Sequence, residues 1–434
     1  MRRHLLTVGV ALAATLGTGV GLAEVDVKFS KKKDVEKAVA KLVGGEIDYT
    51  MSREREQTLN EIDGNLQKDT KGVALRTPAF WVEAMQNGYF EKRKAWKSTG
   101  RVTEEKVQFA YADGSAGETT FACFGGKLAN PGEPTVLLVT LLPKDTDAKA
   151  WLEANWAANE AALAKWVVAA LPMSDKFPVA DQPHLLAYVF GTMRSNFNCD
   201  GNRWYLEGVG EACTAAQKAA TRSMPDRLAG LILRDPAAAA VNDNAKLFHT
   251  VVVHSGDANP VAAALAEMDA ECVTTVPAGD GATAAVATWV SGHAGRTLAP
   301  TYSFVTETTE DRILAPVAGA VYLSSPSKRG APISFTVSFD KEAGTVTLDG
   351  ENLGEFRLMF NDDLLDLDKP VKIVCNGEVL EEGRQFERNL KEIFEIADQF
   401  GEYGRVSTAS FLAPAPAKVE AAAGAGDGEK KDGE

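Results

Sequence analysis

The strongest local signal in this chain is the stretch Arg203-Trp-Tyr-Leu-Glu-Gly208-Val-Gly210-Glu-Ala212-Cys-Thr-Ala-Ala-Gln217. Its aromatic and apolar beginning is typical of a strand, and its alanine-rich end is typical of a helix. Gly208 and Gly210 lie between the two halves, where glycine permits a sharp change of chain direction. The stretch therefore predicts a strand, a tight turn and a helix in immediate succession.

Strands and helices alternate on both sides of this stretch. Residues 135–142 are almost entirely apolar, as in a strand whose sheet is covered on both faces. We expect further strands at 166–170, 228–233, 247–253 and 272–276, and helices at 147–163, 183–197, 260–268 and 282–290. This alternation predicts an α/β fold with a doubly wound, mostly parallel sheet over residues 106–300.

The two flanks of this region have a different texture. Helical patterns at 34–65 and 79–97 predict a helical N-terminal extension over residues 24–105. After residue 300, short strand-like runs separated by turn residues predict a small antiparallel β domain over 301–412, closed by a helix at 385–400. Residues 413–434 are rich in Ala, Pro, Gly and charge, a composition that predicts a disordered tail.

Charge and the first residues bear on location. A net charge of −14 and a pI near 5.0 disfavour nucleic acid and anionic membranes as partners, because both bind clustered Lys and Arg. Arg2 and Arg3 precede an apolar run that ends in small residues, which predicts a signal peptide over 1–23, cleaved after Ala23. We therefore expect a secreted or periplasmic protein with no membrane span in the mature chain.

Neither cysteines nor acidic residues suggest a cofactor. The five cysteines are odd in number and form no C-x-x-C pair, so buried single thiols are expected, without a zinc site. The acidic run 361–368 lacks the register of a calcium-binding loop. No metal and no cofactor are predicted.

With these elements placed, Thr135 to about Pro300 resembles an α/β-hydrolase core. Residues 72–412 resemble a group of bacterial secreted esterase- and peptidase-like proteins in which such a core carries a C-terminal β domain. Three stretches carry the likeness: Leu75-Arg-Thr-Pro-Ala-Phe-Trp-Val-Glu-Ala-Met85, Leu364-Leu-Asp-Leu-Asp-Lys-Pro-Val-Lys-Ile-Val-Cys-Asn-Gly377, and Asn202 to Gly208 followed by Pro225-Asp-Arg-Leu-Ala-Gly230.

The resemblance implies a Ser-His-acid triad, and its positions are changed here. The turn aligns with the G-x-S-x-G nucleophile elbow, in which Gly208 and Ala212 are the small outer residues and Gly210 replaces the serine. Asn259, with Asp257 as the neighbouring alternative, aligns with the acid, and Asp280 aligns with the histidine. The glycine-bearing oxyanion loop is replaced by Leu142-Pro-Lys-Asp145. No catalytic residue is therefore expected.

Two nearby side chains are assigned structural roles. His293 is expected at a helix end, where a histidine can interact favourably with the helix dipole. Cys213 lies one helical turn after the elbow and is expected to pack within the helix layer.

Three functions remain open. The first is an exported pseudoenzyme with a binding or structural role toward an unknown small molecule or protein. The second is a serine hydrolase of esterase, depolymerase or peptidase type with a non-standard nucleophile, for which Ser195 and Ser255 are the nearest serines. The third is a nucleotide-binding βαβ protein, because Gly208 and Gly210 form a G-x-G turn and Asp235 follows the next strand.

Overall fold

The computed structural model describes residues 31–44, 51–66, 68–93, 100–110, 115–126, 135–159, 166–174, 182–224, 227–239, 242–293, 295–296, 299–306, 321–325, 328, 331–400 and 403–418. The predicted signal peptide and residues 419–434 of the predicted tail lie outside these ranges. Within them, no helix is long and apolar enough to span a membrane.

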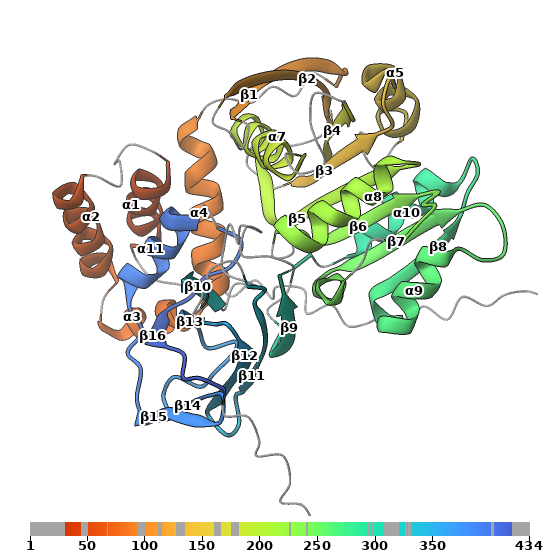
Figure 1. Cartoon of the computed structure of the whole chain (residues 1–434). Coiled ribbons are helices and arrows are strands. Elements are labelled where there is room, and N and C mark those ends of the chain that lie inside the picture. The colour runs from red at the N-terminus through yellow and green to blue at the C-terminus, as the bar shows by residue number, and fades with distance from the viewer. Residues whose placement is uncertain are drawn as a thin grey trace, which may run out of the picture.

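A sheet of eight described strands, in the order β1-β2-β4-β3-β5-β6-β7-β8, forms the core of one part of the molecule, beside the N-terminal helices and the C-terminal strands (Figure 1). Strands β3 to β8 run parallel to one another, whereas β2 pairs antiparallel with both β1 and β4. Their bounds are β1 Thr103–Ala110, β2 Ala116–Gly125, β3 Thr135–Leu142, β4 Trp166–Pro172, β5 Cys199–Val209, β6 Gly230–Arg234, β7 His249–His254 and β8 Val273–Pro277. This sheet confirms the predicted α/β fold with a mostly parallel sheet.

Helices cover both faces of this sheet, because successive strand residues point to opposite sides. One face packs on α7 (Gln182–Asn196), α8 (Ala212–Lys218) and α9 (Pro260–Met268). The other packs on α5 (Ala148–Leu152), the π-helix η1 (Glu153–Ala157) and α10 (Ala282–Gly292). Of the helix expected at 147–163, residues 148–157 are helical, as α5 followed by the π-helical turn η1, and residues 160–163 lie outside the described ranges.

The C-terminal strands form two smaller sheets. One has the order β15-β14-β12-β11-β9 and the other β10-β13-β16. The bounds are β9 Thr301–Val305, β10 Val321–Ser325, β11 Ser334–Asp340, β12 Thr345–Glu351, β13 Glu355–Phe360, β14 Val371–Cys375, β15 Glu378–Arg384 and β16 Ala409–Pro414. Pairing is antiparallel except between β12 and β14, which are parallel, so the predicted antiparallel β region is confirmed apart from this one pair.

The chain also remains paired beyond residue 412, where the sequence predicted a disordered tail. Ala413 and Pro414 belong to β16 and pair with β13, and the Asn376 side chain donates a hydrogen bond to the Pro416 carbonyl at 2.8 Å. Backbone pairing thus orders a segment whose side chains bury little apolar surface.

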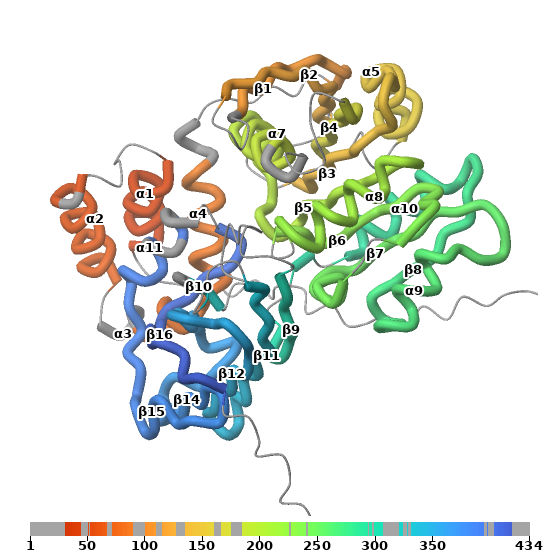
Figure 2. Tube along the Cα trace, viewed as in Figure 1, coloured from red at the N-terminus to blue at the C-terminus, as the bar shows by residue number. Residues whose placement is uncertain are grey.

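The N-terminal helices share a core with the helix near the C-terminus. These are α1 (Lys32–Val43), α2 (Ser52–Asn65), α3 (Lys68–Leu75) and α4 (Pro78–Arg93), and α11 (Leu390–Phe400) lies among them in Figure 2. Trp81 is fully buried in this cluster, with its ring edge-on to Phe394 at 5.9 Å. The helix predicted to close the β domain therefore buries its apolar side against the opposite end of the chain.

Candidate functional site

The turn after β5 is the candidate site that the sequence singles out. Gly210 lies between β5 and α8 with φ +55°, in the left-handed region. Its N–H donates to the carbonyl of Arg234 at 2.8 Å, and its carbonyl accepts from the Cys213 N–H at 3.1 Å. The predicted succession of strand, tight turn and helix is confirmed.

The two glycines of this turn serve different purposes. A Cβ at Gly208 would lie 2.8 Å from both the Ala216 Cβ and the Cys213 Cα, so helix α8 can pack on β5 only where a side chain is missing. A Cβ at Gly210 would meet only the Pro143 Cγ, at 3.7 Å. The left-handed backbone, not crowding, therefore favours glycine at 210, and a serine side chain would have room there.

The turns that follow β5, β6, β7 and β8 lie at one edge of the sheet, because these strands are parallel. Backbone hydrogen bonds join these turns, the first of which is the bond from the Gly210 N–H to the Arg234 carbonyl. The Asp235 N–H likewise donates to the Val253 carbonyl at 2.8 Å, and the Ala278 N–H donates to the His254 carbonyl at 2.9 Å. The loop after β3 joins this edge, since the Lys144 N–H donates to the Glu211 carboxylate at 3.2 Å.

Asn259, at the position aligned with the acid, is committed to a helix end. Its side-chain oxygen accepts from the Val261 and Ala262 N–H groups at 2.9 and 3.3 Å, which caps α9, and its NH₂ donates to the Pro236 carbonyl at 3.0 Å. Asp257 and Asp280 are exposed in loops. Among the described residues, no hydrogen bond joins any of these three side chains to a histidine.

Two histidines lie at opposite ends of β7 and a third at the end of α10. His254 ends β7 on the same edge as Gly210, and its Nδ1 is buried without a hydrogen-bond partner among the described residues. His249 begins β7, and its Nε2 lies 2.8 Å from the Thr274 hydroxyl. His293 is the C-cap of α10, within 3.1 Å of the Tyr205 hydroxyl. Neither His249 nor His254 was predicted from the sequence as a site residue.

The dipole role expected of His293 was wrong, although its place at a helix end was right. Burial, reinforced by nearby His249 and Arg203, lowers the pKa of His293 to about 4. A neutral imidazole at pH 7 has no charge to interact with the helix dipole. Its contribution there is a hydrogen bond and stacking on Trp289, with ring centroids 4.8 Å apart.

Cys213 has the packing role that was expected of it. Its buried thiol lies 3.2 Å from the Gly208 carbonyl and 3.3 Å from the Arg234 carbonyl, to which it can donate. Burial raises the pKa of this thiol to about 12, so it is protonated at neutral pH. Since the thiolate is the nucleophilic form, the protonated Cys213 thiol is not an active nucleophile.

A buried ion pair beneath the turn was not foreseen from the sequence. The Glu207 carboxylate is completely buried on β5 and accepts from Arg234 Nε at 2.6 Å, from the Thr140 hydroxyl at 2.7 Å and from Trp156 Nε1 at 2.9 Å. The Arg234 guanidinium also lies 5.5 Å from the Trp156 ring centroid. The available signal was a glutamate inside an apolar strand, but its partners come from β3, η1 and β6.

This network ties the site to the rest of the sheet. Both members of the ion pair lie near the strand ends that carry the turn, and the Arg234 carbonyl accepts the Gly210 N–H. Every Glu207 oxygen is engaged by a donor, and the group is shielded from water. The carboxylate therefore positions the ends of β5 and β6 and is not placed to act as a general base.

The two outer stretches that carried the resemblance contact one another. The Arg76 guanidinium donates to Asp368 at 2.8 Å, which links the α3–α4 turn to the loop before β14. Arg388 donates to the same Asp368 at 2.9 Å and binds Asp362 through Nε at 2.8 Å. Two carboxylates of the acidic run, Asp362 and Asp368, are thus bound by arginines, and Asp366 pairs with Lys369 at 3.0 Å.

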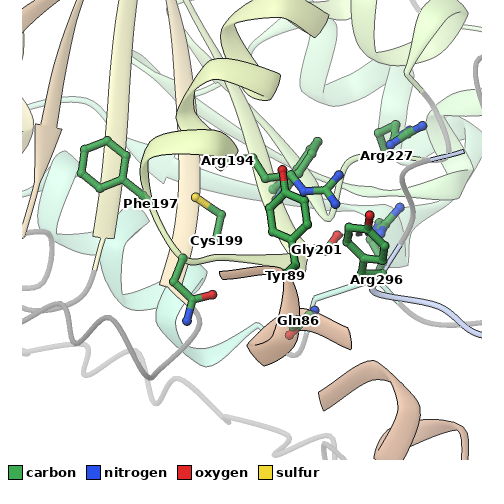
Figure 3. Close-up of a pocket in the computed structure, with 11 residues that line it drawn as sticks. Gln86, Tyr89, Arg194, Phe197, Cys199, Gly201, Arg227 and Arg296 are labelled. Atoms are coloured by element: carbon green, nitrogen blue, oxygen red, sulfur yellow. Dashed lines mark hydrogen bonds between the residues drawn. The ribbon is translucent and has the colours of Figure 1, made fainter. Parts of the chain in front are cut away.

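Figure 3 shows a small cavity between α4, α7 and the start of β5. The Arg194 guanidinium contacts the rings of Tyr89 and Tyr403, 4.5 and 4.4 Å from their centroids, and the two rings contact one another with centroids 5.1 Å apart. The cavity volume is about 20 Å³, enough for roughly one water molecule. This site is a cation–π cluster that joins the helical and sheet regions, and its cavity is too small for a substrate.

No family model and no curated protein matches this chain. Among solved structures, a thermostable esterase is 18% identical, with a TM-score of 0.32, over 44% of this chain and 59% of its own, which is less than two thirds of its length. Est1E from Butyrivibrio proteoclasticus is 13% identical over 43% of this chain and 96% of its own, with a TM-score of 0.32. The fluorophosphonate-binding serine hydrolase FphF of Staphylococcus aureus is 11% identical over 45% and 99%, with a TM-score of 0.33. Likenesses at these scores carry no inference about function.

Proposed function

We propose that this chain is an exported pseudoenzyme: an α/β-hydrolase-fold protein that has lost its nucleophilic serine and has a binding or structural role. Gly210 carries the proposal. It occupies the elbow position with φ +55° and leaves space for a side chain that the residue does not have. A Ser-His-acid mechanism requires a hydroxyl at that point, activated by a histidine that an acid orients.

The surrounding residues support the same proposal. The Asn259 side chain caps a helix, and Asp280 is an exposed carboxylate that cannot take the role of the catalytic histidine. Cys213 is a protonated thiol in the helix layer. Ser195 donates its hydroxyl to the Gly191 carbonyl at 2.8 Å within α7 and is engaged in that helix. Export is proposed from the charged and apolar pattern of residues 1–23 alone.

A fluorophosphonate probe tests the proposal, because it labels activated serines covalently. We expect no labelling of the mature protein, and the same result for the variant Ser255→Ala, which removes the serine that follows His254. Labelling of wild type that Ser255→Ala abolishes would identify a working nucleophile and would overturn the proposal.

The variant Gly210→Ser is the complementary test. Because a Cβ at this position meets only Pro143, the variant is expected to fold and to remain without esterase turnover. The matched control is Gly210→Ala, which imposes the same backbone strain without a hydroxyl. Turnover in the serine variant but not in the alanine variant would show that a functional histidine and acid remain.

Mass spectrometry of the exported protein tests cleavage after Ala23.

A further inference from the structure

A second and larger cavity lies at the opposite edge of the sheet from Gly210. It is formed by the residues that precede or begin β6, β7 and β8, by the end of α10, and by β9 of the C-terminal region. Tyr205, whose hydroxyl contacts the cavity-lining His293, is five residues before Gly210 on β5, about 16 Å of extended chain. The volume of about 450 Å³ falls in the range of small-molecule sites.

The two sides of this cavity are held together by specific contacts. The Asn244 side chain accepts from the Val305 N–H at 2.8 Å and donates to the Val305 carbonyl at 2.6 Å, so it binds the edge of β9 as a neighbouring strand would. Arg296 anchors the segment after α10 by donating to the Gly201 carbonyl at 2.6 Å. The cavity is therefore a built feature of the junction between the sheet and the β9 sheet.

The charged lining of the cavity is predominantly cationic. Lys246, Arg296 and Arg405 contribute positive charge, and Asp269 is the acidic residue among the lining. Lys246 also lies 3.6 Å from Asp243, outside the lining. The Asp269 carboxylate accepts from the Glu271 N–H at 2.9 Å. A cationic lining in a chain of net charge −14 is a local reversal that favours an anionic ligand.

The histidines of the lining are neutral and fixed in position. Burial lowers the pKa of His249, and the pKa of His293 is lowered to about 4. The Gly295 N–H can only donate, and it lies 3.3 Å from His293 Nδ1, so this nitrogen accepts and Nε2 carries the proton. The Trp289 ring packs on both imidazoles, at centroid distances of 4.8 Å from His293 and 5.2 Å from His249, and the two imidazole centroids are 6.1 Å apart.

Two alternative uses of these residues are disfavoured. Burial and Asp269 raise the pKa of the Cys272 thiol to about 12, so it is neither a nucleophile nor a ready metal ligand. Within the described part of the chain, no group of three His, Cys, Asp or Glu residues is arranged to hold a metal ion. Apolar residues complete the lining, among them Leu228, Phe248 and Tyr302.

We propose that this cavity binds a small organic anion, with a phosphate or carboxylate group directed to Lys246, Arg296 and Arg405 and a short apolar body against Leu228, Phe248 and Tyr302. The site goes beyond the proposed function, since it does not depend on whether the Gly210 turn can hydrolyse a substrate. The protein would recognise its ligand at the edge of the sheet that the hydrolase elbow does not use.

Calorimetric titration of the full exported chain tests this site with phenyl phosphate, benzoate and the neutral analogue benzamide. We expect saturable one-to-one binding of at least one anion and none of benzamide. Lys246→Met should weaken that binding about fivefold and Arg405→Met at least about tenfold, because each removes one cation from a partly desolvated site. The control Lys372→Met removes an exposed lysine on β14 and should leave the affinity unchanged.

The relative affinities of the two anions distinguish a phosphate ligand from a carboxylate ligand. Tighter phenyl phosphate indicates a phosphate ligand, and tighter benzoate indicates a carboxylate. Arg405 is buried, so Ala299→Phe provides a second variant that fills the cavity without removing a charge and should abolish binding. The proposal is overturned if neither anion binds more tightly than benzamide. It is equally overturned if Lys246→Met and Ala299→Phe bind as wild type does.

Discussion

The buried pair of Glu207 and Arg234 should be the most sensitive polar contact near the candidate site. In the variant Glu207→Gln the side chain keeps its shape but loses its charge, and Arg234 is left with an unbalanced charge. The Glu207 and Arg234 side chains are 0% and 11% exposed, so water cannot replace the lost partner. Removing one member of such a pair costs about 3–5 kcal/mol. We expect about 3 kcal/mol, because glutamine can still accept from Thr140 or Trp156.

Urea unfolding followed by tryptophan fluorescence measures this loss, since Trp156 contacts Glu207 directly. The matched control is Glu382→Gln, which breaks the pair with Lys372 at 3.1 Å. Those side chains are 69% and 40% exposed, and a loss below about 1 kcal/mol is expected. Arg234→Met and the double variant complete a double-mutant cycle, in which we expect a coupling of about 2 kcal/mol or more.

The buried-pair interpretation fails if Glu207→Gln costs no more than the exposed control. It also fails if the double variant loses the full sum of the two single losses, because independent effects would mean that the two charges do not stabilise one another. A change in the slope of the unfolding free energy against urea concentration would indicate that a variant exposes a different amount of surface on unfolding. Unfolding free energies are therefore compared only between variants that have the same slope.

Two further predictions concern the glycines and the histidines. Gly208→Ala should destabilise the protein by about 2–3 kcal/mol, because its Cβ would overlap the backbone of Cys213. Gly210→Ala should cost only about 1 kcal/mol, from the strain of its left-handed backbone. Thermal unfolding measures both losses, and a larger loss in Gly210→Ala than in Gly208→Ala would contradict this prediction. The folded-state pKa of His293, about 4, lies below the usual value of 6.5, so between these two pH values the unfolded chain binds more protons than the folded chain. The stability that the neutral imidazole contributes is therefore fully present above pH 6.5 and falls as the pH drops toward 4. After allowance for partial exposure of the ring, this loss should be about 1–2 kcal/mol. Urea unfolding at pH 7 and pH 4.5 should show a smaller loss in His293→Phe than in wild type, and equal losses would refute the assignment.

The sequence by itself determined the features that depend on neighbouring residues. The alternation of apolar strands and helices from 135 to 290 and the small residues around Gly210 predicted the parallel sheet and its tight turn, because side-chain periodicity and glycine freedom act over a few residues. The missing hydroxyl at 210 could likewise be read directly. The short strand-like runs after residue 300 correctly indicated a change to smaller sheets.

Only the tertiary structure decided which distant residues meet. Glu207 and Arg234 each look like an isolated charge at the end of an apolar strand, and their pairing follows from the adjacency of β5 and β6. Burial made His293 neutral, and backbone pairing with β13 ordered β16 past residue 412. The packing of α11 on the N-terminal helices and the cationic cavity beside β9 have the same origin. Long-range packing sets burial, and burial sets both charge state and partner, which no local pattern encodes.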